Sequence, residues 1–186
     1  MQYPAASYRF LITFILMFLM FYGFHLCIIG ITSPGRLYSS FLDQHFNYIK
    51  TWRQFSISAT ASILKMMGYT VFTTETTLKV HGHAGFKLVY SCLGYGIMSC
   101  FASFVLSFPK PWLSRFIFLV LGLATIQILN IIRFTLISIY YKPQVTILQA
   151  NHHDLFNYTL YTILLLIVYL WLQFPQTKKR NQQQFY

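Results

Sequence analysis

Four long apolar stretches limit how this chain can fold more than any other feature of its sequence. Each has few or no charged residues and about the length of a membrane-spanning helix, which needs about 20 apolar residues to cross the hydrocarbon core of a bilayer. They run over residues 10–31, 88–108, 116–133 and 155–174. We therefore predict an all-α fold, a polytopic bundle of about four to five transmembrane helices.

The amino-acid composition excludes an ordinary soluble domain. Of the 186 residues, 56% are hydrophobic and 9% are charged, whereas soluble domains carry about 25% charged residues. The net charge of +11 comes from Lys and Arg that lie mostly beside the apolar stretches, where they suit the anionic headgroups of membrane lipids. They do not follow one groove or helix face as in nucleic-acid-binding proteins. We predict membrane lipids as partners and no nucleic acid.

The positions of the basic residues also predict the orientation of the helices. Lys110 lies between the second and third stretches, Arg115 follows it, Arg9 precedes the first stretch and 178–180 follow the fourth. Short basic flanks remain in the cytoplasm, so we expect both termini inside. The first stretch is longer than the core of a signal peptide and no cleavage site follows it promptly, which predicts an uncleaved helix.

Two segments then lie outside, residues 32–87 and 134–154. The longer one carries six basic residues, but translocation of a long loop depends only weakly on charge. Within it, residues 55–67 have polar and apolar groups at helical spacing, which indicates a helix along the membrane interface. Residues 70–80 are rich in Thr, Val and Phe, which favours a short extended segment.

This topology brings three polar groups to one layer near the outer face. Cys92 lies a few residues inside the outer end of the second stretch. Asn130 and Arg133 are three residues apart near the outer end of the third, so they share a helix face. His152 and His153 directly precede the fourth stretch. We expect a thiol, a guanidinium and an imidazole at the same depth.

Such a set of groups suits acyl transfer. A thiolate attacks a carbonyl, a histidine accepts and returns protons, and a guanidinium stabilises the oxyanion or the thiolate. Each residue alone has an ordinary explanation: Cys92 as packing, Arg133 as a side chain that reaches headgroups, and the histidines as an interfacial cap. An arginine among apolar neighbours is costly in lipid and usually marks a function. The shared depth of the three groups favours the functional interpretation.

The same residues resemble a known family. Cys92-Leu93-Gly94, Asn130-Ile131-Ile132-Arg133 and His153-Asp154 are similar to the Cys-x-Gly motif, the Asn-x-x-Arg motif and the following His of the exosortase/archaeosortase family of membrane cysteine transpeptidases. The resemblance covers about residues 64–171, over half of the chain. Many members have about eight transmembrane helices, so this chain looks like a short form that contains the catalytic core. Where members commonly carry a Gly-Trp-like pair after the histidine, this chain has Asn157-Tyr158.

The resemblance implies a role for each of these residues. Cys92 is expected to be the nucleophile, Arg133 the partner of the oxyanion or substrate carbonyl, and His153 the general acid and base. Asn130 would support Arg133, and Gly94 completes the first motif. His152 is the alternative acid and base, although the spacing favours its neighbour.

The resemblance also implies a reaction and a cellular location. Members cleave exported proteins that end in a sorting signal made of a recognition motif, a transmembrane helix and a basic end. The expected reaction is formation of a thioester, release of the tail, and transfer of the acyl group to an amine or to water, without a cofactor. The enzyme, a thiol hydrolase acting on peptide bonds, would be a multi-pass protein of the cytoplasmic membrane with its active site at the outer face.

With no internal repeat, the chain is expected to form a single membrane domain over 1–186. Its parts would be a first transmembrane helix, an outer or interfacial segment, a catalytic transmembrane core and a basic cytoplasmic tail, over residues 1–32, 33–87, 88–174 and 175–186.

The sequence leaves one alternative function open, and three further histidines need an explanation. The chain could be a non-enzymatic transporter subunit or assembly factor in which Arg133 binds an anionic ligand or lipid. His81 and His83 could face one side of a strand and bind zinc, but no further ligand is spaced with them, so we predict no metal site. His25 is expected to make a polar contact between helices.

Overall fold

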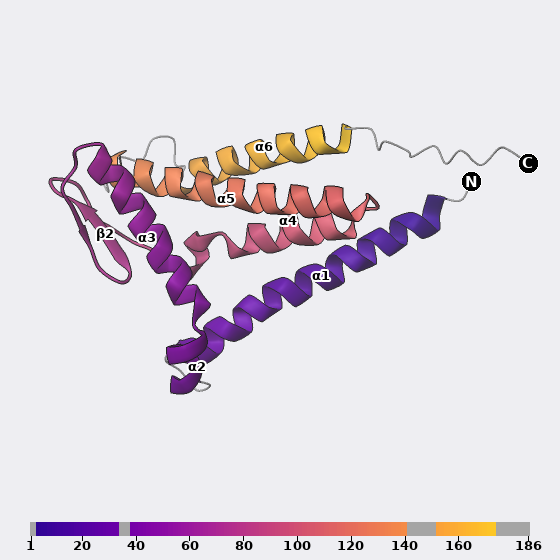
Figure 1. The fold of residues 1–186 in the computed structure, drawn as a ribbon, viewed down its shortest axis with the longest axis horizontal. Helices are drawn as coiled ribbons and strands as arrows, with labels where there is room; N and C mark the ends of the chain where they lie inside the picture. The colour runs from indigo at the N-terminus through magenta and orange to yellow at the C-terminus, as the bar shows by residue number, and fades with distance from the viewer. Residues whose placement is uncertain (1–2, 34–37, 141–151, 174–186) are drawn as a thin grey trace, which may run out of the picture.

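Long helices form most of the molecule. The computed structural model describes residues 3–33, 38–140 and 152–173. Helix α1 (Tyr3–Thr32) packs on α4 (Tyr95–Ser107), α4 packs on α5 (Trp112–Tyr140), and α5 packs on α6 (His152–Gln173), as Figure 1 shows. This arrangement confirms the predicted all-α bundle.

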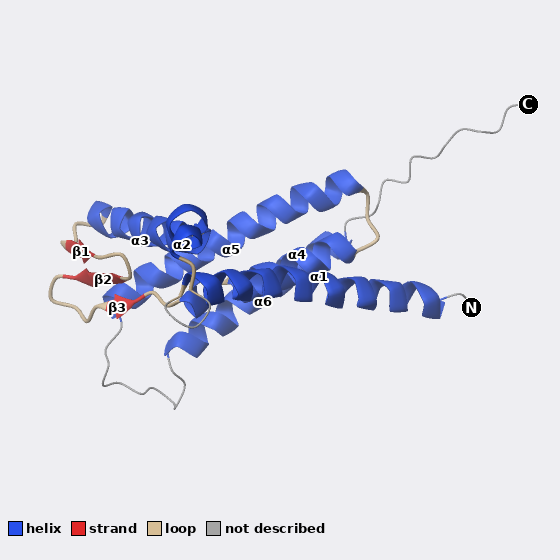
Figure 2. Ribbon diagram, turned by 90° about the horizontal axis from the view of Figure 1, so that it is seen from below, coloured by secondary structure: helices blue, strands red, loops and turns tan. Residues whose placement is uncertain are grey.

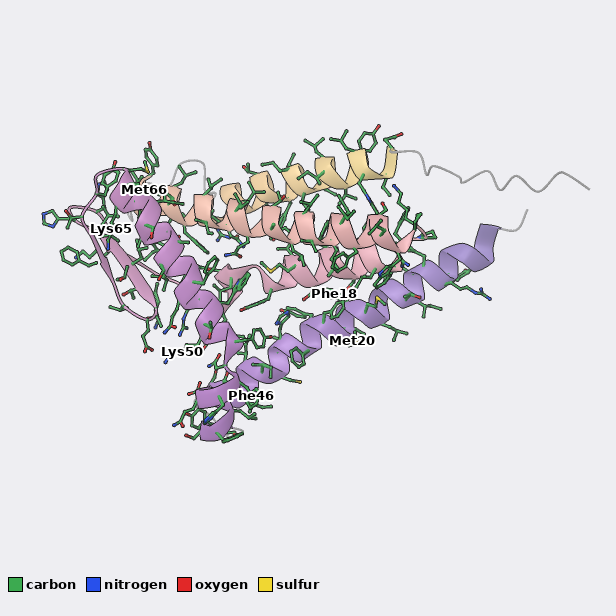
Figure 3. All side chains as sticks on the ribbon, viewed as in Figure 1. Phe18, Met20, Phe46, Lys50, Lys65 and Met66 are labelled. Carbon is green, nitrogen blue, oxygen red and sulfur yellow. The ribbon has the colours of Figure 1, made fainter. Side chains whose placement is uncertain are left out.

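Length and composition identify the segments that can cross a membrane. In the described part of the chain, Tyr8–Thr32, Tyr90–Ser107 and Trp112–Tyr140 are long and apolar enough to span a bilayer, and Tyr161–Gln173 is a shorter apolar helix. Between Leu11 and Leu26, the exposed large side chains of α1 are apolar, as lipid contact requires. Met20 is one of them and is labelled in Figure 3.

A smaller layer covers one end of this bundle. It contains α2 (Ser40–Phe46), α3 (Tyr48–Met66) and an antiparallel sheet of β1 (Val71–Thr73), β2 (Thr77–Val80) and β3 (Phe86–Lys87) in the order β1-β2-β3. Figure 1 shows α3 running across the bundle end, and Figure 2 shows the three strands beside it. Strands β1 and β2 form a hairpin in which Val71 pairs with Val80, closed by a hydrogen bond from the Thr77 N–H to the Thr74 hydroxyl.

The prediction of a helix over 55–67 is confirmed, but the helix begins earlier, at Tyr48. Asn47 caps it by accepting the Lys50 N–H at 2.8 Å, which satisfies one of the free N–H groups of the first turn. The buried face of α3 includes Ile49, Ile57 and Leu64, which pack with Leu78 of β2 in one hydrophobic core. The predicted extended segment over 70–80 is confirmed as the β1–β2 hairpin.

A second hydrophobic core lies farther along the bundle, between α4, α5 and α6. Phe101 and Val105 of α4 meet Ile126 of α5 and Trp171 of α6 there. Gly122 permits this packing, because a Cβ at that position would lie 2.1 Å from the Phe101 ring. The Lys110 ammonium, in the turn between α4 and α5, lies 4.2 Å from the centre of the Trp171 ring.

Two predicted helix boundaries are wrong. The stretch 88–108 is not one helix: it begins with the 3-10 turn η1 (Tyr90–Leu93), and α4 follows only after Gly94. Helix α5 does not end at Arg133 but continues for seven residues to Tyr140. Phe134, the first residue of this extension, packs into the core and stabilises it, and the Ser138 hydroxyl donates to the Phe134 carbonyl. The rest of the predicted outer segment 134–154, from residue 141 to 151, and the predicted tail 175–186 lie outside the described residues.

Candidate active site

Cys92 lies in the 3-10 turn η1, between a strand-like entry at Val89 and the start of α4. Its N–H donates to the Val89 carbonyl at 3.0 Å. The next residue, Leu93, is buried and anchors the turn in the core beneath α3. Gly94 then takes a left-handed conformation, with φ of +80°. Cys92 therefore precedes α4, and its predicted position inside the helix is wrong because α4 begins only after this backbone reversal, at Tyr95, three residues after Cys92.

Gly94 and Asn130 fix η1 against α5. A Cβ at Gly94 would lie 2.5 Å from the Asn130 Nδ2 atom, closer than non-bonded heavy atoms approach. Asn130 is 1% exposed, so it has little room to move away. Only glycine combines the positive φ with this close approach. The contact links the first predicted motif to the second and places the Cys92 turn against the face of α5 that carries Arg133.

Arg133 lies one helical turn beyond Asn130 and contacts Cys92 directly. Its guanidinium donates a hydrogen bond to the Cys92 side chain, and the Tyr161 side chain of α6 lies within electrostatic range of the same group. Arg133 is only 7% exposed. The structure thus brings together two residues that are far apart in the sequence, at a position enclosed by η1, α5 and α6.

His152 and His153 begin α6, but their side chains lie outside the described residues. Figure 1 shows that the N-terminal end of α6 lies at the same end of the bundle as η1 and α3. Tyr161, which approaches Arg133, follows His153 by eight residues, or ~12 Å along a helix axis. The third member of the predicted site remains a prediction.

Helix α3 contributes a second buried arginine that the sequence analysis did not single out. Arg53 is 8% exposed, and its guanidinium carbon lies 5.2 Å from the centre of the Tyr90 ring, in the same turn as Cys92. A signal for it exists in the sequence: Arg53 is four residues from both Ile49 and Ile57, so a helix over this segment puts the charge on its apolar face. The helix predicted from periodicity begins only at residue 55, and Arg53 lies outside it.

Two more polar residues join α3 to α5 in this layer. The Gln127 amide donates to the Ser56 hydroxyl at 3.0 Å, and both side chains are buried. Gln127, Asn130 and Arg133 follow one another at intervals of three residues, so a polar stripe runs along the face of α5 toward Cys92.

The other polar residues from the sequence analysis lie outside this contact. His25 of α1 bonds the Tyr48 hydroxyl of α3 through its Nδ1 atom, which confirms the predicted contact between helices. The rings of His81 and His83 lie beside Phe72 and Tyr69. The residues that the structure describes contain no group of three His, Cys, Asp or Glu side chains that could hold a metal ion.

Comparison with known proteins agrees with the arrangement of the motifs. A family model described as transmembrane exosortase matches residues 4–170, which include all of α3, η1, α4 and α5, nearly all of α1 and most of α6. No curated protein and no solved structure gives a significant match.

Proposed function

Because the chain belongs to the transmembrane exosortase family, we propose that it is a membrane cysteine transpeptidase or protease that removes the C-terminal sorting tail of exported proteins. The observation that carries this proposal is the hydrogen bond from the buried Arg133 guanidinium to the Cys92 side chain. A guanidinium held beside the nucleophilic sulfur is placed to donate to the carbonyl oxygen that becomes negatively charged during the attack.

In the first half of the reaction, the Cys92 thiolate attacks the carbonyl carbon of the scissile peptide bond. The C–S bond forms and the carbonyl electron pair moves to oxygen, which becomes an oxyanion. Arg133 donates to that oxyanion, where charge develops in the transition state. The C–N bond then breaks, and the tail leaves as an amine after it takes a proton from a general acid, for which we propose His153.

In the second half, an amine or water attacks the thioester. His153 accepts the proton of the attacking group, a second oxyanion forms beside Arg133, and the C–S bond breaks to return the Cys92 thiolate. An amine acceptor yields a new amide, and water yields a carboxylic acid. Asn130 does not touch the reacting atoms in this scheme; it positions η1 through its contact with Gly94.

We further propose that this chemistry takes place at the outer face of the cytoplasmic membrane. Support comes from the basic turn that contains Lys110, because short basic loops remain in the cytoplasm. Helix α4 leads from η1 to that turn, so η1 and Cys92 lie at the opposite end of the helix. An exported substrate whose tail crosses the membrane would present its scissile bond on that side.

The decisive experiment is a processing assay in cells that co-express this protein and an exported protein with a sorting tail. Cys92→Ala is expected to abolish tail removal, and Cys92→Ser to reduce it at least ~100-fold, since a hydroxyl is a much weaker nucleophile. Cys100→Ala is the matched control, because this thiol is exposed on α4, outside the Cys92–Arg133 contact. Normal processing by Cys92→Ala would refute the proposal and favour a transporter subunit or assembly factor.

The roles of the other two residues need separate variants. Arg133→Lys keeps the charge but loses the planar fork of donors, so we expect lower processing with normal membrane insertion. His153→Ala is compared with His152→Ala, and only the first is expected to stop processing. The opposite result would transfer the acid and base role to His152.

A further inference from the structure

We propose that a cavity between α1, α3 and α4 binds one glycerolipid of the surrounding membrane, with the ester carbonyls hydrogen-bonded inside it and one acyl chain along α4. The cavity has a volume of about 370 Å³ and is open on one side, which is a typical size for a small-molecule site. Neither Cys92 nor Arg133 is among the described residues that line it. The lipid is therefore a ligand separate from the proposed acyl transfer.

Three buried polar atoms in the lining of this cavity have no hydrogen-bond partner among the described residues. They are the Nε1 atom of Trp52 in α3 and the hydroxyls of Tyr95 and Ser99 in α4. Tyr95 is 7% exposed and Ser99 is 2% exposed. Buried polar groups in native proteins are nearly always paired, because an unpaired one lowers stability. A ligand that fills the cavity and supplies acceptors removes this cost.

The Ser99 hydroxyl differs from the other buried hydroxyls of the described helices. A helical serine or threonine can bond the carbonyl four residues earlier in its own helix. Every other buried serine and threonine that the structure describes makes this bond, namely Thr32, Ser56, Thr60, Ser103, Thr135 and Ser138. Ser99 instead keeps its hydroxyl for the cavity that it lines, where a ligand can bond it.

The chemistry of these three atoms defines the polar part of the ligand. The indole N–H of Trp52 can only donate, and the two hydroxyls can donate as well, so the ligand must carry acceptor oxygens. Among the described lining residues, His25 is the only basic or acidic side chain, and its Nδ1 atom is already bonded to the Tyr48 hydroxyl. The part of the ligand inside the cavity is therefore uncharged. The ester carbonyls of a glycerolipid meet both conditions.

The cavity also changes in character along its length, as a lipid does. Trp52 lies on α3, which crosses the bundle end (Figure 1), and Tyr95 is the first residue of α4. Met98 and Ala102 continue the lining about 5 and 10 Å deeper, at a rise of ~1.5 Å per residue. Phe24 lines the cavity and is also 58% exposed on α1, so an acyl chain can enter from the bilayer.

A transmembrane helix of a partner fits this cavity less well than a lipid. Its backbone groups are bonded within the helix, so its backbone offers no free acceptors to the three polar atoms. A lipid ester has acceptors and no donors. It also lies at the boundary between hydrocarbon and headgroups, where tryptophan and tyrosine are enriched in membrane proteins.

The first test measures lipid binding by the unmodified chain. The detergent-purified protein is titrated with a diacyl phosphatidylcholine and with the dialkyl ether lipid of equal headgroup and chain length, and bound lipid is counted by native mass spectrometry. We expect one diacyl lipid per chain, bound at least about threefold more tightly than the ether lipid, which lacks the carbonyl acceptors. Equal binding of the two lipids would overturn the proposal. Recovery of a second protein chain in place of a tight lipid would overturn it too and favour a helix as the occupant.

Variants then locate the bound lipid. Tyr95→Phe and Ser99→Ala each remove one donor and should weaken diacyl lipid binding about three- to tenfold. Ser103→Ala is the matched control, because that hydroxyl is bonded within α4, and it should leave the affinity unchanged. Ala102→Leu should block the acyl chain without removing a polar group, whereas Ala124→Leu on the exposed side of α5 should have no effect. Unchanged binding in both Ser99→Ala and Ala102→Leu would overturn the proposal.

Trp52 reports directly on the occupant and keeps the proposal testable where Tyr95→Phe fails to fold. In the variant Trp112→Phe/Trp171→Phe it is the single tryptophan, and a diacyl lipid brominated near the ester should quench its fluorescence on contact. We expect quenching in detergent to saturate at one lipid per chain, to be weaker with bromine at the chain end, and to be lost in Ala102→Leu. Quenching that does not depend on the position of the bromine would place the lipid elsewhere and refute the proposal.

Discussion

Replacement of Gly94 by alanine tests how the candidate site is built. Two separate costs arise at this position. The φ of +80° is unfavourable for any residue with a Cβ, by about 1–2 kcal/mol. The added methyl group would also lie 2.5 Å from the Asn130 Nδ2 atom, and inserting a group into a packed core costs about 1–3 kcal/mol. Gly94→Ala should therefore lower the free energy of unfolding by about 2–5 kcal/mol.

Gly68→Ala isolates the first of these costs. Gly68 has a φ of +87°, but no heavy atom lies within 4 Å of the position of its missing Cβ. Gly68→Ala should cost about 1–2 kcal/mol from backbone strain alone. The difference between the two variants measures the contact with Asn130.

Thermal unfolding of the detergent-purified variants, followed by tryptophan fluorescence, gives the comparison. A change of 1 kcal/mol shifts the midpoint by about 2–4 °C in a chain of this size, so Gly94→Ala should melt at least ~2 °C below Gly68→Ala. The alkylation rate of Cys92 should change only in Gly94→Ala, because only that variant displaces η1 from α5. Asn130→Ala should remove part of the penalty of Gly94→Ala, with a coupling of about 1 kcal/mol between the two positions.

Equal destabilisation by Gly94→Ala and Gly68→Ala would show that the Asn130 side chain can move away from the added methyl group without lowering the free energy of unfolding. Together with an unchanged Cys92 alkylation rate, this outcome would refute the argument that the Gly94–Asn130 contact positions the nucleophile.

Three further predictions concern the packing around the site. Gly122→Ala should lower the free energy of unfolding by about 1–3 kcal/mol, because the new Cβ would lie 2.1 Å from the Phe101 ring. Gly30→Ala, in open space on α1, should be neutral or stabilising. Equal melting temperatures of the two variants would contradict the close packing of α4 on α5. Ser56→Ala should lower the free energy of unfolding by about 1–3 kcal/mol, because it leaves the buried Gln127 amide without its acceptor. The double variant Ser56→Ala/Gln127→Leu should recover most of that free energy in the same melting assay. No recovery would show that loss of the hydrogen bond is not the cause. Glu75→Gln should change the free energy of unfolding by less than about 1 kcal/mol, since both side chains of its ion pair with Lys50 are exposed to solvent. A larger loss that persists at high salt would mean that this ion pair anchors the sheet to α3.

The sequence predicted the helices far better than the site geometry. Apolar length is a local property, so the stretches at 10–31 and 155–174 could be assigned directly. Helix α6 follows its stretch to within three residues at each end, and α1 ends one residue after its stretch but begins seven residues before it. The ends of α4 and α5 could not be assigned in this way, because apolar composition continues through η1 and past Arg133. Gly94 ends the turn through its backbone conformation, and the space beside it is filled by Asn130, which is 36 residues away in the sequence.

The prediction that Cys92 and Arg133 share a layer came from counting depth along two helices. Depth alone leaves the rotation of each helix about its axis undetermined, so it does not predict contact. In the structure, the contact of Gly94 with Asn130 sets that rotation, and Arg133, one turn farther on the same face, then reaches the Cys92 side chain.

Arg53 shows the other limit of sequence reasoning. Among six basic residues in a long segment, it looked like an ordinary surface charge, and its burial became evident only once α3 lay across the bundle end over η1. The sequence by itself determined that this chain enters a membrane, where its helices lie and which motifs it carries, because apolar length and residue identity are properties of short segments. The tertiary structure alone decided which polar groups meet, because contacts between α3, η1 and α5 depend on packing between segments that are distant in the chain.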